Sequence, residues 1–192
     1  MESDPAPRFS LCRRESSALL IVDVQTRLAA AMPADARAAV LRNAGILIEA
    51  ARALGIPIVQ TEQYPRGLGA TEPEIAERLA GRAQRLEKTA FSCCGAEGFD
   101  AAVCADNRTQ WILCGMEAHV CVLQTALELH ARGLEVFVVE DGVCSRTDTN
   151  RANALARLRQ AGVIVSNTES VLFEWLRDAA DPQFKALSAL VR

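Results

Sequence analysis

The fold of this 192-residue chain is indicated by the segment SALLIVD, residues 17–23. Its apolar run from Ala18 to Val22 leads directly into an acidic residue, Asp23. A short, uninterrupted apolar run of this kind is typical of a strand buried on both faces in a parallel sheet. The run is far too short to cross a bilayer. We therefore expect a central parallel strand here.

Strands and helices alternate along the rest of the chain. Further strands are expected at residues 56–60, 85–88, 109–114, 134–140 and 163–166, and helices at residues 36–54, from 71 onwards, 97–105, 120–132, 148–160, 168–177 and 181–191. Such alternation with short connections predicts a three-layer α/β/α, doubly wound, mostly parallel sheet of about six strands. One domain should span residues 16–192, after a loose N-terminal arm over residues 1–15.

The composition excludes several classes of protein. The chain is 50% hydrophobic, so it can bury a sizeable core and is not wholly disordered. Its net charge of −3 gives no electrostatic reason to bind nucleic acid or an anionic membrane. The first residues carry acids where a signal peptide needs positive charge, and the seven cysteines are odd in number with no C-x-x-C pair. We expect a cytoplasmic protein that acts on a small molecule, without nucleic-acid or membrane partners.

Three chemically complementary residues follow three of the predicted strands. Asp23 ends the first strand, Lys88 ends the third, and Cys121 lies in the first turn of the helix after the fourth. The carboxyl ends of parallel strands meet at one edge of the sheet, where ligands bind. A cysteine nucleophile is favoured by a helix N-terminus and an ammonium, and a carboxylate can carry its proton. Lys88 also stands out because Lys185 is the only other lysine.

Each of these residues also has a structural interpretation. Asp23 alone would be a turn former, Lys88 a surface charge and Cys121 a small buried residue. A cysteine–histidine dyad would need one of the two histidines: His130 lies far along its helix, while His119 is close enough to Cys121 to line a pocket. A carboxylate base is favoured over either. No glycine-rich dinucleotide motif or P-loop is present.

Together these motifs resemble the isochorismatase-like (cysteine) hydrolases. The resemblance is carried by Asp23-Val24-Gln25, by Lys88-Thr89 and by residues 115–122, GMEAHVCV. The loop at residues 61–69 and the segment at residues 181–185 resemble, more specifically, the isochorismatase domain-containing branch. The resemblance covers nearly the whole domain and implies the isochorismatase-like hydrolase fold.

The resemblance also implies a mechanism. Asp23 would act as general base and then acid, Lys88 would hold the ionised pair, and Cys121 would form an acyl-enzyme that water hydrolyses. A cis peptide would join Met116 and Glu117, and the backbone N–H groups of Glu117 and Cys121 would form an oxyanion hole. Homo-oligomers are common in the family, so a homo-oligomer is expected.

Two departures narrow the implied activity. The loop after the second strand has no histidine, so a metal site and nicotinamidase activity are not expected, and no cofactor is implied. The cysteine argues against cleavage of the vinyl ether of isochorismate. The expected function is therefore a metal-independent cysteine hydrolase of a small amide, carbamoyl or ester substrate.

Three alternatives stay open from the sequence. The chain would be a non-catalytic scaffold or regulatory binding protein, an isochorismatase acting on a vinyl ether, or a thiol redox protein that pairs Cys121 with Cys93, Cys94 or Cys144. The residues flanking the triad are candidates for substrate binding, with loop packing as an equal alternative: Gln25, Gln63, Tyr64, Arg66, Phe91 and Glu117. Glu62 is a competing partner for the guanidinium of Arg66.

Overall fold

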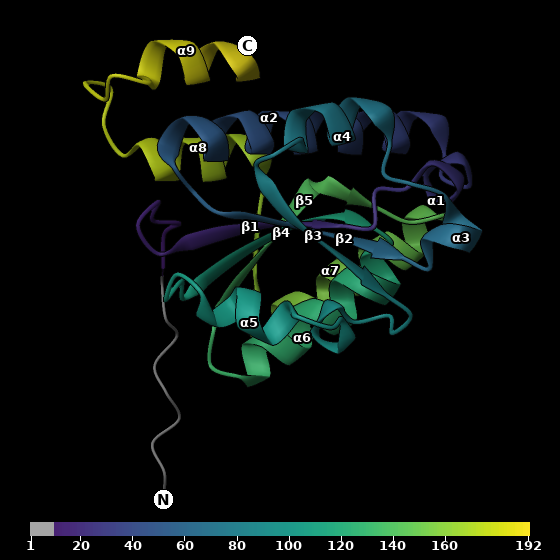
Figure 1. Cartoon of the computed structure of the whole chain (residues 1–192). Helices are drawn as coiled ribbons and strands as arrows, with labels where there is room; N and C mark the ends of the chain where they lie inside the picture. Colours follow the sequence, from purple (N-terminus) through teal and green to yellow (C-terminus); the bar gives the residue numbers. More distant parts are fainter. Residues whose placement is uncertain (1–9) are drawn as a thin grey trace, which may run out of the picture.

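Six parallel strands form the centre of this computed structural model, which describes residues 10–192 (Figure 1). The strands are β1 (Ser17–Val22), β2 (Ile58–Gln63), β3 (Ala83–Lys88), β4 (Gln110–Met116), β5 (Glu135–Cys144) and β6 (Ile164–Ser166). Their order in the sheet is β3-β2-β1-β4-β5-β6, and every neighbouring pair is parallel. The predicted fold class is confirmed.

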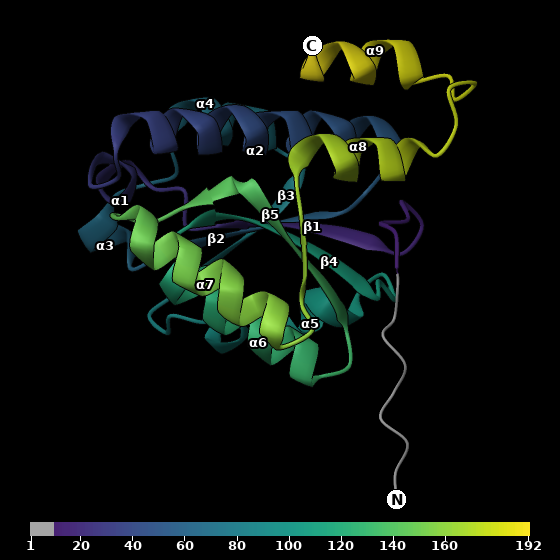
Figure 2. The same cartoon turned by 180° about the vertical axis from the view of Figure 1, so that it is seen from behind.

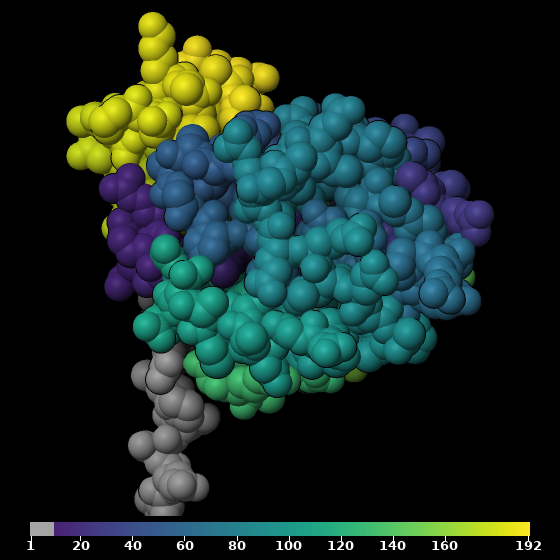
Figure 3. Space-filling model, in the orientation of Figure 1, coloured from purple at the N-terminus to yellow at the C-terminus, as the bar shows by residue number. Residues whose placement is uncertain are grey.

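Helices cover both faces of the sheet (Figures 1 and 2). One face is covered by α2 (Ala34–Leu54), α4 (Pro73–Leu79) and α8 (Thr168–Leu176), and α9 (Phe184–Ser188) adds Leu187 to the same apolar core. The other face is covered by α5 (Phe99–Cys104), α6 (Leu123–Ala131) and α7 (Asp148–Gln160). In the space-filling view the C-terminal segment forms one corner of the molecule (Figure 3). Within residues 10–192, no helix combines the length and apolar character that a bilayer crossing requires.

The sequence of β1 explains its central place. All six of its residues are buried. Leu19 and Ile21 join the core beneath α2, whereas Ala18, Leu20 and Val22 join the core on the α6 face. Because successive side chains point to opposite faces, an uninterrupted apolar run supplies both cores at once.

Two predicted helices differ from the observed ones. The helix expected at 120–132 begins instead with a π-helical turn, Ala118–Val122, before α6. The Glu117 carbonyl accepts hydrogen bonds from the N–H groups of both Val120 and Val122, at 3.1 and 3.2 Å, which widens the first turn. The helix expected at 181–191 is divided into α9 and a 3₁₀ turn, Ala189–Val191.

The predicted N-terminal arm lies partly outside the described residues, since residues 1–9 are not described. Residues 10–15 are attached to the domain. The N–H of Cys12 donates to Glu174 at 2.7 Å and that of Arg13 to Gln110 at 2.7 Å, and the Cys12 side chain is fully buried.

Strand order places the topological switch point between β1 and β4. The chain runs outward from β1 to β2 and β3, and then returns to the other side of β1 with β4. At the carboxyl ends, Val22 of β1 lies beside Gly115 of β4. Gly115 has φ +129°, and a Cβ there would lie 2.0 Å from the Val22 carbonyl oxygen. The absence of a side chain at Gly115 therefore allows the two strands to approach at the edge where Asp23 and residues 117–121 follow.

We predict that Gly115→Ala destabilises the protein by at least about 3 kcal/mol, because the new methyl group clashes with backbone that cannot move freely. Gly133→Ala is the matched control: its φ is also positive, +84°, but nothing lies within 4 Å of the added Cβ. It should cost only about 1–2 kcal/mol. Urea unfolding of the two variants checks this, and equal losses would show that backbone conformation alone, not the close approach, requires glycine at 115.

Candidate active site

The predicted Asp23 and Lys88 form a fully buried ion pair at the carboxyl edge of the sheet. Lys88 Nζ lies 2.6 Å from Asp23 Oδ2, and both side chains have 0% exposure. Asp23 directly follows β1 and has φ +48°, a conformation that costs a non-glycine residue about 1–3 kcal/mol. Its N–H is nonetheless held by the Thr61 carbonyl at 3.2 Å and its carbonyl by the Gln25 N–H at 2.8 Å. The backbone thus aims the carboxylate into the protein.

Lys88 is held by several acceptors. Besides Asp23, its ammonium lies 2.8 Å from Gln63 Oε1, 2.9 Å from the Phe91 carbonyl and 3.3 Å from the Ala90 carbonyl. An ammonium has three N–H donors and no acceptor. All three are therefore engaged within the protein, so Lys88 supplies charge and position rather than a free donor for a ligand.

Cys121 joins this pair from the π-helical turn after β4. It is buried, with 5% exposure. Burial, together with the charge of the Asp23 carboxylate, raises the pKa of Cys121 to about 12, while the Lys88 ammonium opposes the rise. At neutral pH the thiol is therefore protonated. Because both charges act on this thiol, the structure brings the three residues predicted from strand ends close together.

Two residues that the sequence analysis did not include in this triad complete its surroundings. Thr61, in β2, donates from Oγ1 to Asp23 Oδ1 at 2.7 Å, so both carboxylate oxygens are occupied. The same hydroxyl lies 3.5 Å from the sulfur of Cys93. Burial and the Asp23 charge raise the pKa of Cys93 to about 11. The sequence analysis named Cys93 only as one of three possible disulfide partners of Cys121.

Glu117 lies between β4 and the turn that carries Cys121. The peptide bond joining Met116 to Glu117 is cis. The Glu117 carboxylate is buried and accepts from both the backbone N–H and Nε of Arg146, at 3.0 and 3.1 Å. This side chain is therefore engaged in anchoring the segment after β5, and any direct part of Glu117 in catalysis would come from its backbone.

Gln25 and Gln63 hold the loops around the triad. The buried Gln25 amide accepts from the Gln63 N–H at 2.7 Å, and donates to the Gln63 and Gly69 carbonyls at 3.0 and 2.6 Å. Gln63 Nε2 donates to the Thr89 carbonyl at 2.7 Å, opposite its bond to Lys88. Both amides proposed for substrate binding are thus used within the protein, as supports for Lys88 and for the loop after β2.

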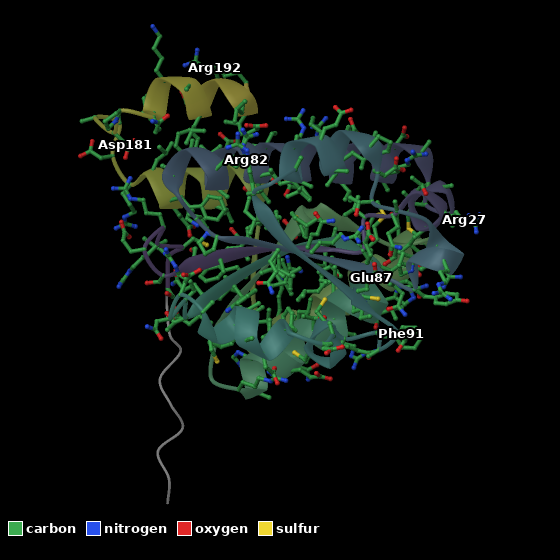
Figure 4. The ribbon with its side chains drawn as sticks, in the orientation of Figure 1. Arg27, Arg82, Glu87, Phe91, Asp181 and Arg192 are labelled. Atoms are coloured by element: carbon green, nitrogen blue, oxygen red, sulfur yellow. The ribbon has the colours of Figure 1, made fainter. Side chains whose placement is uncertain are left out.

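Tyr64, Arg66 and Phe91 lie near the outer surface of the site. Tyr64 and Phe91 are 55% and 56% exposed. Tyr64 and Arg66 line an open hollow of about 400 Å³ that reaches Lys88, and its other lining residues are Pro65, Glu87, Thr89, Gly95 and Glu97. Figure 4 shows Glu87 and Phe91 at the same side of the molecule as Arg27. Glu62, a competing partner for Arg66 in the sequence, bonds instead to Thr71 and Arg85.

The histidines lie outside the triad's hydrogen bonds. His119 Nδ1 lies 3.0 Å from Ser145 Oγ, next to the segment that Glu117 anchors. His130 lies in α6, where its Nδ1 is buried without a partner. Among residues 10–192, no cluster of three or more histidine, cysteine or acidic side chains has the arrangement of a metal site.

Comparison with known proteins assigns the family. The family model described as "Isochorismatase domain" matches residues 17–170. The chain belongs to this family. It is 44% identical over 153 residues to isochorismatase domain-containing protein 2 of Danio rerio, covering 79% of this chain and 76% of the relative. It is also 37% identical over 183 residues to the secreted isochorismatase effector Isc1 of Phytophthora sojae, covering 92% and 85%.

Solved structures share the fold over nearly the whole length. A protein described as MAR1 ribonuclease from Caenorhabditis elegans superposes with a TM-score of 0.87 at 37% identity, over 95% of this chain and 92% of that one. YcaC from Escherichia coli, described as an octameric hydrolase of unknown specificity, gives 0.87 at 26% identity, over 95% and 90%. YcaC from Pseudomonas aeruginosa, with covalent acrylamide, gives 0.88 at 26%, over 96% and 91%.

The buried ion pair leads to a prediction about stability. Lys88→Met leaves the Asp23 charge buried without its partner and should cost about 3–5 kcal/mol, whereas the double variant Asp23→Asn/Lys88→Met should recover a large part of that loss. Lys185→Met, at the exposed second lysine, should stay within about 0.5 kcal/mol of wild type. Urea unfolding at pH 7 measures all three, and a double variant less stable than Lys88→Met would contradict coupling of the pair.

The thiol leads to a prediction about pH. Because the Asp23 charge favours the neutral thiol, Asp23→Asn should lower the pKa of Cys121 below about 12. The pH at which Cys121 becomes alkylated by iodoacetamide should then move down, with the exposed Cys104 as an internal reference. Mass spectrometry of timed digests gives both profiles. An unchanged or higher midpoint for Cys121 would show that Asp23 does not control the thiol.

Proposed function

We propose that the protein is a metal-independent cysteine hydrolase that transfers an acyl or carbamoyl group from a small amide, carbamoyl compound or ester to water. One observation supports the proposal most strongly: the fully buried Asp23–Lys88 ion pair lies close enough to the buried Cys121 thiol for both charges to act on it. In our proposal these residues are the base, the compensating cation and the nucleophile, at the switch point of an isochorismatase-family domain.

The first step follows from the protonated state of the thiol. Cys121 Sγ attacks the substrate carbonyl carbon while its proton passes to Asp23, so no free thiolate has to exist in the resting protein. Lys88 offsets the charge that moves between sulfur and carboxylate. Asp23 then returns the proton to the leaving amine or alcohol, which departs and leaves a thioester on Cys121.

The second step uses the same groups with water as the nucleophile. Asp23 accepts a proton from the water that attacks the thioester, and the Cys121 sulfur leaves and is protonated again. In our proposal the backbone N–H groups of Glu117 and Cys121 stabilise the oxyanion of both tetrahedral intermediates. The anchoring of Glu117 by Arg146 supports this assignment, because a fixed backbone needs no reorganisation during the reaction.

Burial supports a small substrate. Asp23 and Lys88 are inaccessible at their side chains and Cys121 is 5% exposed. A phosphodiester within a folded RNA chain would have to enter this interior, and the protein's net charge of −3 gives nucleic acid no general attraction. We therefore propose a small-molecule substrate in spite of the ribonuclease description of the C. elegans structure.

We further propose a cytoplasmic homo-oligomer. Within the described residues all seven cysteines are free thiols, which suits a reducing compartment. The octameric state described for E. coli YcaC supports self-assembly. Light scattering of the purified protein at several concentrations tests the assembly, and a monomer throughout would overturn it.

Turnover of an activated ester, p-nitrophenyl acetate, and of a panel of amides and carbamates tests the proposed activity. Cys121→Ser and Asp23→Asn should each lower kcat/KM by at least about 100-fold, whereas Cys104→Ser, at an exposed thiol, should leave it unchanged. An acyl adduct should appear on Cys121. Equal turnover by all variants, or adducts only on other cysteines, would exclude the mechanism.

The panel also separates the alternatives. Isochorismate cleavage that survives Cys121→Ser would favour vinyl-ether hydrolysis. A protein with no Cys121-dependent turnover or adduct, but with a copurifying partner, would be a non-catalytic binding member of the family.

A further inference from the structure

A second buried thiol, unused by the hydrolytic mechanism, lies near the same carboxylate as Cys121. Cys93 is fully buried in the 3₁₀ turn Cys93–Gly95, five residues after Lys88. Its sulfur lies 3.5 Å from Thr61 Oγ1, and that hydroxyl is 2.7 Å from Asp23 Oδ1. The charge of Asp23 also acts on the Cys121 thiol, and Cys93 and Cys121 are close enough to influence each other. Two thiols from different segments therefore lie near one carboxylate.

A second side chain ties the two segments together. The Thr125 hydroxyl accepts from the Cys93 N–H at 2.9 Å and donates to the Cys121 carbonyl at 2.7 Å. Both contacts are buried. A single hydroxyl thus joins the backbones of the two cysteines, independently of the contact between Thr61 and the Cys93 side chain.

The other cysteines are placed differently. Cys94 is half-buried beside Ser92, Glu128 and Arg132, away from the Asp23–Lys88 pair. Cys144 lies near Glu117 and Arg151. Of the three cysteines that the sequence left open as disulfide partners of Cys121, only Cys93 also lies close to the Asp23 carboxylate.

We propose that Cys93 and Cys121 form a reversible intramolecular disulfide when the protein meets a small hydroperoxide, so that Cys93 is a resolving thiol for the nucleophile. The proposal rests on Cys121 being the reactive thiol of the proposed function. Any path that admits the proposed substrate to Cys121 also admits hydrogen peroxide, which is smaller, and Cys93 then protects the oxidised sulfur from further oxidation.

The chemistry takes two balanced steps. In the first, Cys121 sulfur attacks one peroxide oxygen, its proton passes by way of Asp23 to the departing oxygen, and the O–O bond breaks. Sulfur is oxidised to sulfenic acid, and the hydroperoxide is reduced to an alcohol, or to water when it is hydrogen peroxide. In the second, Cys93 sulfur attacks the Cys121 sulfur, the S–O bond breaks, and hydroxide leaves as water with the Cys93 proton. A dithiol reductant reverses the change.

Mass mapping after peroxide treatment tests the proposal. Reduced protein is exposed to stoichiometric hydrogen peroxide, quenched with N-ethylmaleimide and digested without reductant. Trypsin leaves Cys93 in residues 89–108 and Cys121 in residues 109–132, and cleavage after Met116 separates Cys121 from Cys114. The expected product is a cross-link of these two peptides that thiol reductant removes.

Adjacent variants give the matched control. Cys93→Ser should reduce the cross-link at least tenfold and, when further equivalents of hydrogen peroxide are added, let Cys121 proceed to sulfinic acid. Cys94→Ser should leave the cross-link intact. Thermal melting confirms that both variants fold, and Cys93→Ala provides a second variant of the same position. Retention of the cross-link in Cys93→Ser, or its loss only in Cys94→Ser, would overturn the assignment.

The outcome also separates this inference from the proposed function. Cys121 that takes an acyl adduct but forms no cross-link with Cys93 under peroxide would overturn the redox proposal and leave the hydrolase standing. Cys121 that takes neither adduct nor cross-link would overturn both.

Discussion

The carboxyl edge of the sheet is organised by the need to satisfy a buried ion pair. Removing a carboxylate and an ammonium from water carries a penalty of several kcal/mol per ion, which their mutual attraction offsets only if the remaining hydrogen-bonding positions are filled. Here Thr61 fills the second oxygen of Asp23, and Gln63 with the carbonyls after β3 fills the remaining donors of Lys88. The carboxyl ends of β1, β2 and β3 are therefore held together by the hydrogen bonds that satisfy this one ion pair.

The side chain of Gln25 contacts neither charged group but supports one that does. Gln63 bonds to Lys88, and the Gln25 amide holds the backbone of Gln63 and of Gly69 in the loop after β2. Gln25 itself follows the strained Asp23, whose carbonyl holds the Gln25 N–H. Asp23, Gln25, Gln63 and Lys88 are thus linked in a ring of hydrogen bonds, which the 2.6 Å ion pair between Lys88 and Asp23 closes.

Much of this arrangement was predictable from the sequence because it depends on local patterns. The apolar run 18–22 is typical of a strand buried on both faces, and the rule that ligands bind at strand carboxyl ends brought Asp23, Lys88 and Cys121 together. The surroundings were not predictable in the same way. Thr61, Thr125 and Cys93 are ordinary core residues by type, and their contacts join segments 32 to 38 residues apart. The π-helical turn depends on one carbonyl accepting two bonds, which no periodicity reveals.

In the proposed mechanism, a protonated nucleophile is a consequence of this arrangement rather than an obstacle to it. Asp23 and burial both favour the neutral thiol, and the N–H donors of Lys88 are bonded to Asp23, Gln63 and the Phe91 carbonyl. In our proposal, sulfur becomes nucleophilic only when a reactant inside the site accepts its electrons as Asp23 accepts its proton. Reactivity is then limited to molecules small enough to enter, since larger electrophiles meet a buried thiol with its proton in place. The ion pair that costs free energy to bury thereby makes access to the interior the main determinant of which molecules react.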